Sequence, residues 1–331
     1  MNTIRMQDIL PAFKSGTAIG HRNLTLVPLL EDVQQDRFQN YLLASEAIHA
    51  GALTVSEISD AGTVPELLAV NDGDTPVLLI DGEELQGAKQ NRILNTSVLL
   101  PPRSKTRFPV SCVEEGRWSH ISPTFQSGNY APSSLRQRKS LDVQHSLRTR
   151  GRAESDQGAV WDSVAQHIEA SEIQSPTRAM SDAMATRGDV IERYQDALLY
   201  PSGACGVVAA VCGQFVAMDA FDSPSTLKEI WCRLVASYAM DAEMARGTEG
   251  KSFTQKSVGV ILEHVGEQTC EAFAAVGEGQ DIRFETSNMV GQGLQVEQRL
   301  LHISVFPRSD DRQTRHNSLS HISPPSRRKR S

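Results

Sequence analysis

The sequence predicts a protein of the α+β class, on three observations. From His21 to Val113, short apolar runs and turn-forming residues alternate roughly every ten residues, which is typical of a β sandwich or barrel-like unit. From Gln157 to Leu199, apolar residues recur at helical spacing. After Gly203 the pattern predicts strands around a long helix. We therefore expect a β-rich N-terminal unit, central helices and a C-terminal strand–helix–strand unit.

The N-terminal elements are predicted from apolar runs that end at turn signals, such as the acidic turn after Leu30 and the Asn71-Asp72-Gly73-Asp74 turn. We expect one short helix, at Tyr41–His49. The expected strands are Asn23–Leu30, Ala52–Ser59, Leu67–Val70, Val77–Ile80, Ile93–Leu100 and Thr106–Val113.

Residues 119–152 are expected to connect the two halves. Ser119 to Ser134 is rich in Ser, Pro and Gly and predicts a linker, and a basic stretch from Arg136 to Arg152 follows. We interpret this stretch as a solvated, flexible connector, with binding of a phosphorylated ligand or of nucleic acid as the alternative. The expected organisation is then a β-rich unit at 1–118, this connector, a helical and α+β unit at 153–306, and a polar, disordered tail at 307–331.

The C-terminal half contains the clearest helix, Pro224–Arg246. Pro224 suits a first helical turn, and Asp222 is the expected N-cap. A hairpin is predicted at Gly203–Phe221 and a further helix at Gln255–His264. Strands are predicted at Cys270–Val276, Ile282–Thr286 and Leu300–Phe306.

Composition excludes several classes of protein. The net charge of −7 argues against a nucleic-acid binder, and no run of about 18 apolar residues predicts a membrane helix. The N-terminus lacks the apolar stretch of a signal peptide, so we expect a cytoplasmic protein. The five cysteines are widely spaced and form no C-x-x-C pair, which predicts neither disulfides nor a zinc site. Cys205, Cys212, Cys232 and Cys270 lie in apolar surroundings and are expected to be buried. Neither a metal-ligand spacing nor a nucleotide-binding glycine motif occurs, so no metal and no cofactor is predicted.

The segment from Asp81 to Trp118 concentrates the polar residues that could perform chemistry. Glu83 or Glu84 could act as an acid or base whose pKa is set by a neighbouring cation, and Cys112 could be a nucleophile. Because side chains alternate along a strand, only one of the two glutamates can face a given cavity. The residues expected to bind a ligand in this segment are Gln86, Lys89, Gln90, Asn91, Arg92, Asn95 and Trp118. The simpler interpretation is a hairpin tip with solvated charges.

The same segment, DGEELQGAKQNRILNTSVLLPPRSKTRFPVSCVEEGRW, resembles the signature of a bacterial family of uncertain biochemistry. This is the ARG and rhodanese-phosphatase superfamily associated protein domain family. Further stretches are similar to the family: SDQGAVWDSV (Ser155–Val164), VCGQFVAMDAFDSPSTLKEIWCRLVASYAMDA (Val211–Ala242) and GQGLQVEQRLLHISVF (Gly291–Phe306).

The resemblance implies a setting beside ADP-ribosylglycohydrolase-type enzymes, in ADP-ribose or NAD-derived metabolism. It adds Asp156, Gln157 and Trp161 to the expected ligand-binding residues, against the alternative of a helix cap with an apolar anchor. The hypothesis is binding or processing of a phosphorylated nucleotide-like ligand, whose phosphates would meet Lys89, Arg92 and Arg107. The alternatives are a non-catalytic scaffold or partner for neighbouring enzymes, and a thiol enzyme that uses Cys112.

Overall fold

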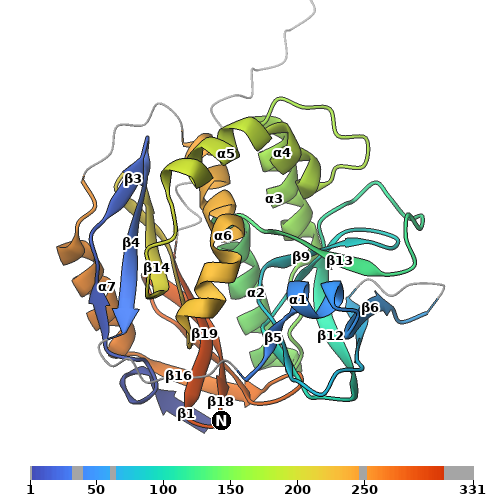
Figure 1. Cartoon of the computed structure of the whole chain (residues 1–331), viewed down its shortest axis with the longest axis horizontal. Helices are drawn as coiled ribbons and strands as arrows, with labels where there is room; N and C mark the ends of the chain where they lie inside the picture. The colour runs from blue at the N-terminus through green and yellow to red at the C-terminus, as the bar shows by residue number, and fades with distance from the viewer. Residues whose placement is uncertain (1, 32–39, 60–64, 246–251, 309–331) are drawn as a thin grey trace, which may run out of the picture.

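The largest sheet joins both ends of the described chain, which in this computed structural model comprises residues 2–31, 40–59, 65–245 and 252–308 (Figure 1). Its strands are antiparallel, and a short 3-10 turn, Met6–Asp8, follows the first. In order they are β1 (Asn2–Arg5), β16 (Thr269–Ala274), β17 (Gln280–Glu285), β18 (Met289–Val296), β19 (Arg299–Pro307), β15 (Gln214–Phe221), β14 (Ala204–Val211), β4 (Leu24–Glu31) and β2 (Phe13–Ser15), with β3 (Ile19–His21) beside β4.

The remaining strands form two smaller sheets around a separate apolar core, which includes Leu67, Leu94 and Phe108. The order in the six-stranded sheet is β13 (Phe125–Tyr130), β9 (Glu83–Gly87), β10 (Arg92–Leu94), β12 (Ser104–Cys112), β7 (Glu66–Asn71) and β6 (Leu53–Glu57). The three-stranded sheet is β11 (Val98–Leu100), β8 (Val77–Leu79) and β5 (Leu42–Leu43). The α+β class and the strand-rich N-terminal region are confirmed. The expected strand Ile93–Leu100 is divided between β10 and β11, and residues 2–31 extend the large sheet instead of the smaller ones.

Helices fill the space between the large sheet and the six-stranded sheet (Figure 1). Helix α6 packs on β14 with one side and on β13 with another, and α2 packs on β18 and β19. The helices are α1 (Ala44–His49), α2 (Ser133–Arg150), α3 (Gln157–Ala170), α4 (Met180–Thr186), α5 (Gly188–Ala197), α6 (Pro224–Met244) and α7 (Gln255–Gly266). Helix α7 lies against the other face of the large sheet. None of the helices in the described residues is long and apolar enough to cross a membrane.

Helix α6 shows how local sequence determines an element. Pro224 occupies its first turn, and the N-cap is Ser223, whose Oγ accepts a hydrogen bond from the Ser225 N–H at 3.2 Å. Asp222 was the expected cap, but this prediction is wrong. Its carboxylate is buried and binds Tyr41 and Arg299, because the chain turns back onto β19 there.

Residues 119–152 do not form the expected linker. They contain β13 and the whole of α2, which ends at Gly151 with a left-handed φ of 68°. The basic side chains Arg136 and Lys139 are completely buried, so this part of the connector is not solvated. Most of the expected C-terminal tail, 309–331, lies outside the described residues.

None of the cysteines that the structure describes forms a disulfide. Cys205, Cys212 and Cys270 are buried, as their apolar surroundings predicted. Cys232 on α6 was expected to be buried as well, but it is exposed because it lies opposite the apolar stripe of that helix.

Candidate functional site

The predicted polar segment forms the β9–β10 hairpin and the loop after β12. Its charged and amide side chains are not solvated at a hairpin tip, since Glu83 and Glu84 are each 2% exposed and Arg92 is fully buried. Burying such groups costs free energy unless they are paired or hydrogen-bonded. Each of them therefore needs partners, and those partners divide the segment into separate clusters.

Glu83 and Glu84 face different surroundings, as strand alternation predicted. Glu83 accepts hydrogen bonds from Arg233 of α6 at 2.9 Å and from Ser127 of β13 at 2.5 Å. It thereby ties β9 to α6 and β13. Glu84 is instead hydrogen-bonded by amides, and within the described residues no cation forms an ion pair with it.

Three side-chain amides donate hydrogen bonds to the Glu84 carboxyl group. Gln86 Nε2 lies 2.7 Å from Oε2, Asn129 Nδ2 lies 3.4 Å from the same oxygen, and Asn91 Nδ2 lies 3.5 Å from Oε1. Asn129 belongs to a bulge in β13, between Ser127 and Tyr130, where the β9–β13 register shifts. The bulge re-aims this side chain toward β9.

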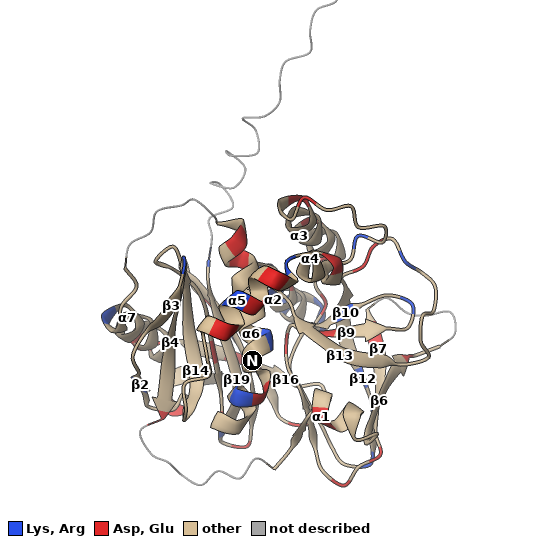
Figure 2. Ribbon diagram, turned by 45° about the horizontal axis from the view of Figure 1, so that its top comes forward, with Lys and Arg blue, Asp and Glu red and all other residues tan. Residues whose placement is uncertain are grey.

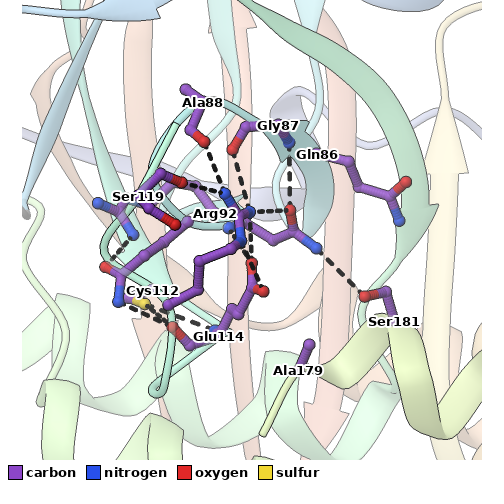
Figure 3. A network of polar contacts seen from close by, with 12 residues as sticks. Gln86, Gly87, Ala88, Arg92, Cys112, Glu114, Ser119, Ala179 and Ser181 are labelled. Carbon is purple, nitrogen blue, oxygen red and sulfur yellow. Dashed lines mark hydrogen bonds and ion pairs between the residues drawn. The ribbon is translucent and has the colours of Figure 1, made fainter. Parts of the chain in front are cut away.

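Asn91 is held in place by a second carboxylate, that of Glu114 (labelled in Figure 3), and by Arg117. Glu114 Oε2 accepts the Asn91 backbone N–H at 3.0 Å, and Arg117 donates to both Glu114 oxygens at 2.8 and 2.6 Å. Arg117 also donates to the carbonyl oxygens of Gly87 and Ala88. Arg117 thereby satisfies carbonyl groups of the β9–β10 turn. Because Arg117 also donates to Asn91 Oδ1 at 3.2 Å, the side-chain amide of Asn91 has a fixed orientation.

The two carboxyl groups of this network have different acidities. Burial raises the pKa of Glu84 to about 7, although the hydrogen bonds from Gln86 and Asn129 act in the opposite direction. Burial would also raise the pKa of Glu114, but hydrogen bonds from Arg117 and the Asn91 N–H hold it below its ordinary value. At neutral pH Glu114 is therefore ionised, whereas Glu84 can give or take a proton.

A cavity of about 470 Å³ lies between the β9–β13 pair and the helices α4 to α6, beside Glu84, although Glu84 itself does not line it. Gln86 and Asn129 line it, as does Ser181, whose Oγ accepts a hydrogen bond from Asn91 Nδ2 at 3.2 Å. Figure 3 shows Gln86 and Ser181 on the same side of the network. The remaining lining residues are Asp182, Met184, Ala185, Gly188, Ile191, Glu192, Gln195 and Ala236. None of the described lining residues is Lys, Arg or His, and Figure 2 marks acidic positions on the bordering helices α4 and α5.

Lys89, Gln90, Arg92 and Trp118 form a second cluster that does not line the cavity, and Gln90 Nε2 joins it to the first by donating to the Glu114 carbonyl at 2.9 Å. Lys89 Nζ and Arg92 Cζ lie 5.3 and 5.9 Å from the centre of the Trp118 ring, in cation–π geometry. Arg92 also donates to Gln90 at 2.8 Å and lies 3.9 Å from Glu57. The structure does not bring Arg107 to these two cations, because Arg107 lines a different cavity at the ends of β7 and β12.

Cys112 is enclosed by the elements around it. Gln157 of α3 accepts from its backbone N–H and donates to its carbonyl, both at 2.8 Å, and its thiol donates to the Glu114 carbonyl at 3.2 Å. Burial raises the pKa of the Cys112 thiol, against the opposite effects of Arg92 and Trp161. A nucleophilic cysteine needs a low pKa and access, and this thiol has neither.

Asn95 and Asp156 have structural partners. Asn95 donates to the Ala153 carbonyl at 3.0 Å and accepts from Ser111 at 2.6 Å. Asp156 is the N-cap of α3, where Oδ1 accepts the N–H groups of Gly158 and Ala159. The contacts of Asp156 are therefore those of a helix cap, which was the alternative to a ligand-binding role.

Asn129 and Ser181 were not among the residues expected from the sequence. They lie in stretches that carried no motif, and they reach Glu84 only because β13 and α4 pack beside β9. No group of three or more His, Cys, Asp or Glu within the described residues is arranged to hold a metal ion.

Comparison with known proteins identifies one family. The model of the ARG and Rhodanese-Phosphatase-superfamily-associated Protein domain matches residues 12–306. The match leaves out β1, the 3-10 turn after it and the last residue of β19, and includes every other element described above. Neither a curated protein nor a solved structure matches the chain.

Proposed function

We propose that this chain, which belongs to the family of ARG and Rhodanese-Phosphatase-superfamily-associated Protein domains, binds a small hydroxyl-rich molecule in the cavity beside Glu84. The observation that carries the proposal is the fully buried Glu84, whose pKa is raised to about 7 and whose amide partners line that cavity. Perturbed carboxyl groups next to a cavity are the usual mark of a binding or catalytic site.

The chemistry of the lining selects the class of ligand. Amides and hydroxyls that flank a carboxyl group match a ligand with several hydroxyl groups, because each hydroxyl both donates and accepts. The described lining includes Asp182 and Glu192 but no Lys, Arg or His. A phosphate bound in this cavity would therefore be repelled by the acidic side chains. We therefore assign the cavity to the ribose part of a nucleotide-like molecule such as ADP-ribose, with its phosphates outside.

Glu84 is separated from the cavity by Gln86 and Asn129, so it would act on the ribose by orienting these two amides toward the hydroxyl groups. The setting implied by the family name, beside ADP-ribosylglycohydrolase-type enzymes, supports a ribosyl ligand by association only.

Calorimetric titration with ADP-ribose, with ribose as the minimal ligand, tests the proposal. We expect saturable binding of ADP-ribose to the wild type and at least tenfold weaker binding to Glu84→Gln, which keeps the shape but loses the proton. Glu263→Gln is the matched control, since Glu263 lies exposed on α7, across the large sheet. No binding at millimolar ligand to folded protein, or equal binding by both variants, would contradict the proposal.

A scaffold for neighbouring enzymes is the alternative function. The observation that favours it is the exposure of two large apolar side chains after β12, Trp118 (49%) and Ile121 (68%). Such a patch is typical of a protein–protein contact. If Trp118→Ala and Ile121→Ser abolish co-purification of a partner while Glu84→Gln leaves it intact, the scaffold function is favoured.

A further inference from the structure

A second cavity, of about 400 Å³, lies between the last turns of α2 and the start of α3. It shares no lining residue with the cavity beside Glu84. Its lining residues are Asp142, His145, Ser146, Arg150, Glu154, Ser155, Asp156 and Gln157. The two cavities are therefore separate, and a ligand of this one is independent of the ligand proposed for the cavity beside Glu84.

Two polar groups that line this cavity have no hydrogen-bond partner among the described residues. One is the hydroxyl of Ser146, a residue only 5% exposed. The other is Oδ2 of Asp142, one helical turn earlier, which accepts no hydrogen bond but forms an ion pair with Arg138 Nε at 3.7 Å. Buried polar groups are nearly always satisfied, so the unsatisfied Ser146 hydroxyl, beside a carboxylate oxygen that accepts no hydrogen bond, indicates a missing donor.

The remaining charges favour a cation as that donor. Asp142, Glu154 and Asp156 place three carboxyl groups around the cavity. Arg150 and Arg152 lie 3.8 and 3.6 Å from Glu154 and neutralise that carboxylate. Asp142 is paired with Arg138 on its own helix, and His145 also lines the cavity. The carboxyl-terminal end of α2 adds partial negative charge from its last carbonyl groups. The opposite charge at the start of α3 is offset by Asp156, which caps that helix.

We propose that this cavity binds the ammonium group of a small amine, with Asp142 and Ser146 as its recognition residues. An ammonium group has three donors and no acceptor, which matches a carboxylate oxygen, a hydroxyl oxygen and a further carboxylate from Asp156 or Glu154. Burial raises the pKa of Asp142, although Arg138 and a hydrogen bond from the Asp156 backbone act in the opposite direction. Ser155 is already hydrogen-bonded to Ser111 at 2.5 Å, so it forms the wall of the cavity.

Titration with 1,5-diaminopentane, followed by calorimetry and thermal melting, tests this assignment. The neutral comparison is 1,5-pentanediol, which has the same length but hydroxyls in place of the ammonium groups. We expect the full chain to bind the diamine and not the diol. Asp142→Asn should weaken diamine binding at least tenfold, and Ser146→Ala about threefold.

The matched control is Glu267→Gln, because it removes one negative charge at an exposed position beyond α7. It should bind the diamine as the wild type does. Equal binding by Asp142→Asn and Glu267→Gln would show that the diamine responds only to net charge and would overturn the proposal. Absence of diamine binding, or binding of inorganic phosphate that the diamine does not displace, would overturn it too. If Asp142→Asn fails to fold, Ser146→Ala decides alone.

Discussion

Two buried carboxyl groups, Glu84 beside its cavity and Asp219 in the interior, have opposite electrostatic surroundings. Asp219 on β15 accepts from Arg136 of α2 at 2.7 and 3.1 Å and from Tyr238 and Ser304. Burial alone would raise its pKa, but Arg136 holds it well below the ordinary value. Glu84 is as deeply buried and receives only amides. Compensation of charge, not burial, thus separates a carboxylate that stabilises the fold from one available for chemistry.

The paired region extends beyond Asp219 and joins the sheets. Lys139 of α2 binds Asp81, which follows β8, and Gln292 of β18 donates to the same carboxylate. His302 of β19 contacts Ser97 at 2.8 Å. These contacts fix the position of the β9–β10 hairpin relative to the large sheet, so the cavity beside Glu84 has a rigid support.

The largest expected effect is the loss of stability in Asp219→Asn. This substitution leaves Arg136 buried without its charge partner, which costs about 3–5 kcal/mol in comparable cases. Chemical denaturation measures the free energy of unfolding. The control is Asp74→Asn, which breaks the exposed ion pair between Asp74 and Arg103 and should change little. A loss in Asp219→Asn no greater than in this control would refute the role of charge compensation.

The next effect is a decline of stability with rising pH that comes from Glu84. Its folded-state pKa, about 7, lies above the ordinary value of 4.5, so folding takes up a proton between these values. The stabilisation is complete below pH 4.5 and decreases as pH rises to about 7, by about 3 kcal/mol in total. Asp219 contributes no slope in this window, because its pKa is lowered and its stabilisation is lost only in acid.

The measurement is the difference in free energy of unfolding between wild type and Glu84→Gln across pH 4 to 9. Other titrating groups are common to both proteins and cancel in the difference. We expect Glu84→Gln to gain stability relative to the wild type as pH rises toward 8. A difference that stays constant with pH would show that Glu84 keeps an ordinary pKa.

An element or a site residue could be predicted from the sequence when the residues that it contacts are close to it in the chain. Helix α6 was predicted because its first-turn proline and its apolar stripe are local, although the cap is Ser223 and not the expected Asp222. Helix α2 was missed, since the inward side chains Arg136 and Lys139 are charged, and their partners Asp219 and Asp81 lie far away in the chain. Strand alternation separated Glu83 from Glu84 correctly. The sequence could not assign Glu84 a raised pKa, because that depends on which side chains β13 and α4 place around it.

The smallest effect concerns Gly128, in the bulge of β13, and it tests whether the amides around Glu84 set its acidity. A Cβ at this position would lie 2.8 Å from Cγ and Cδ of Gln86, so Gly128→Ala must displace that side chain. Gln86 donates the shortest of the three amide hydrogen bonds to Glu84 and lowers its pKa. A hydrogen bond contributes about 1 kcal/mol, which corresponds to somewhat less than one pH unit. In Gly128→Ala the decline of stability should therefore continue to a pH that is higher by that amount.

Gly259→Ala is the matched control, because the space around Gly259 on α7 is open and its only expected effect is a small gain in helix stability. If the upper end of the decline stays in place in Gly128→Ala, Gln86 does not tune Glu84, and the missing cation alone accounts for the difference between Glu84 and Asp219.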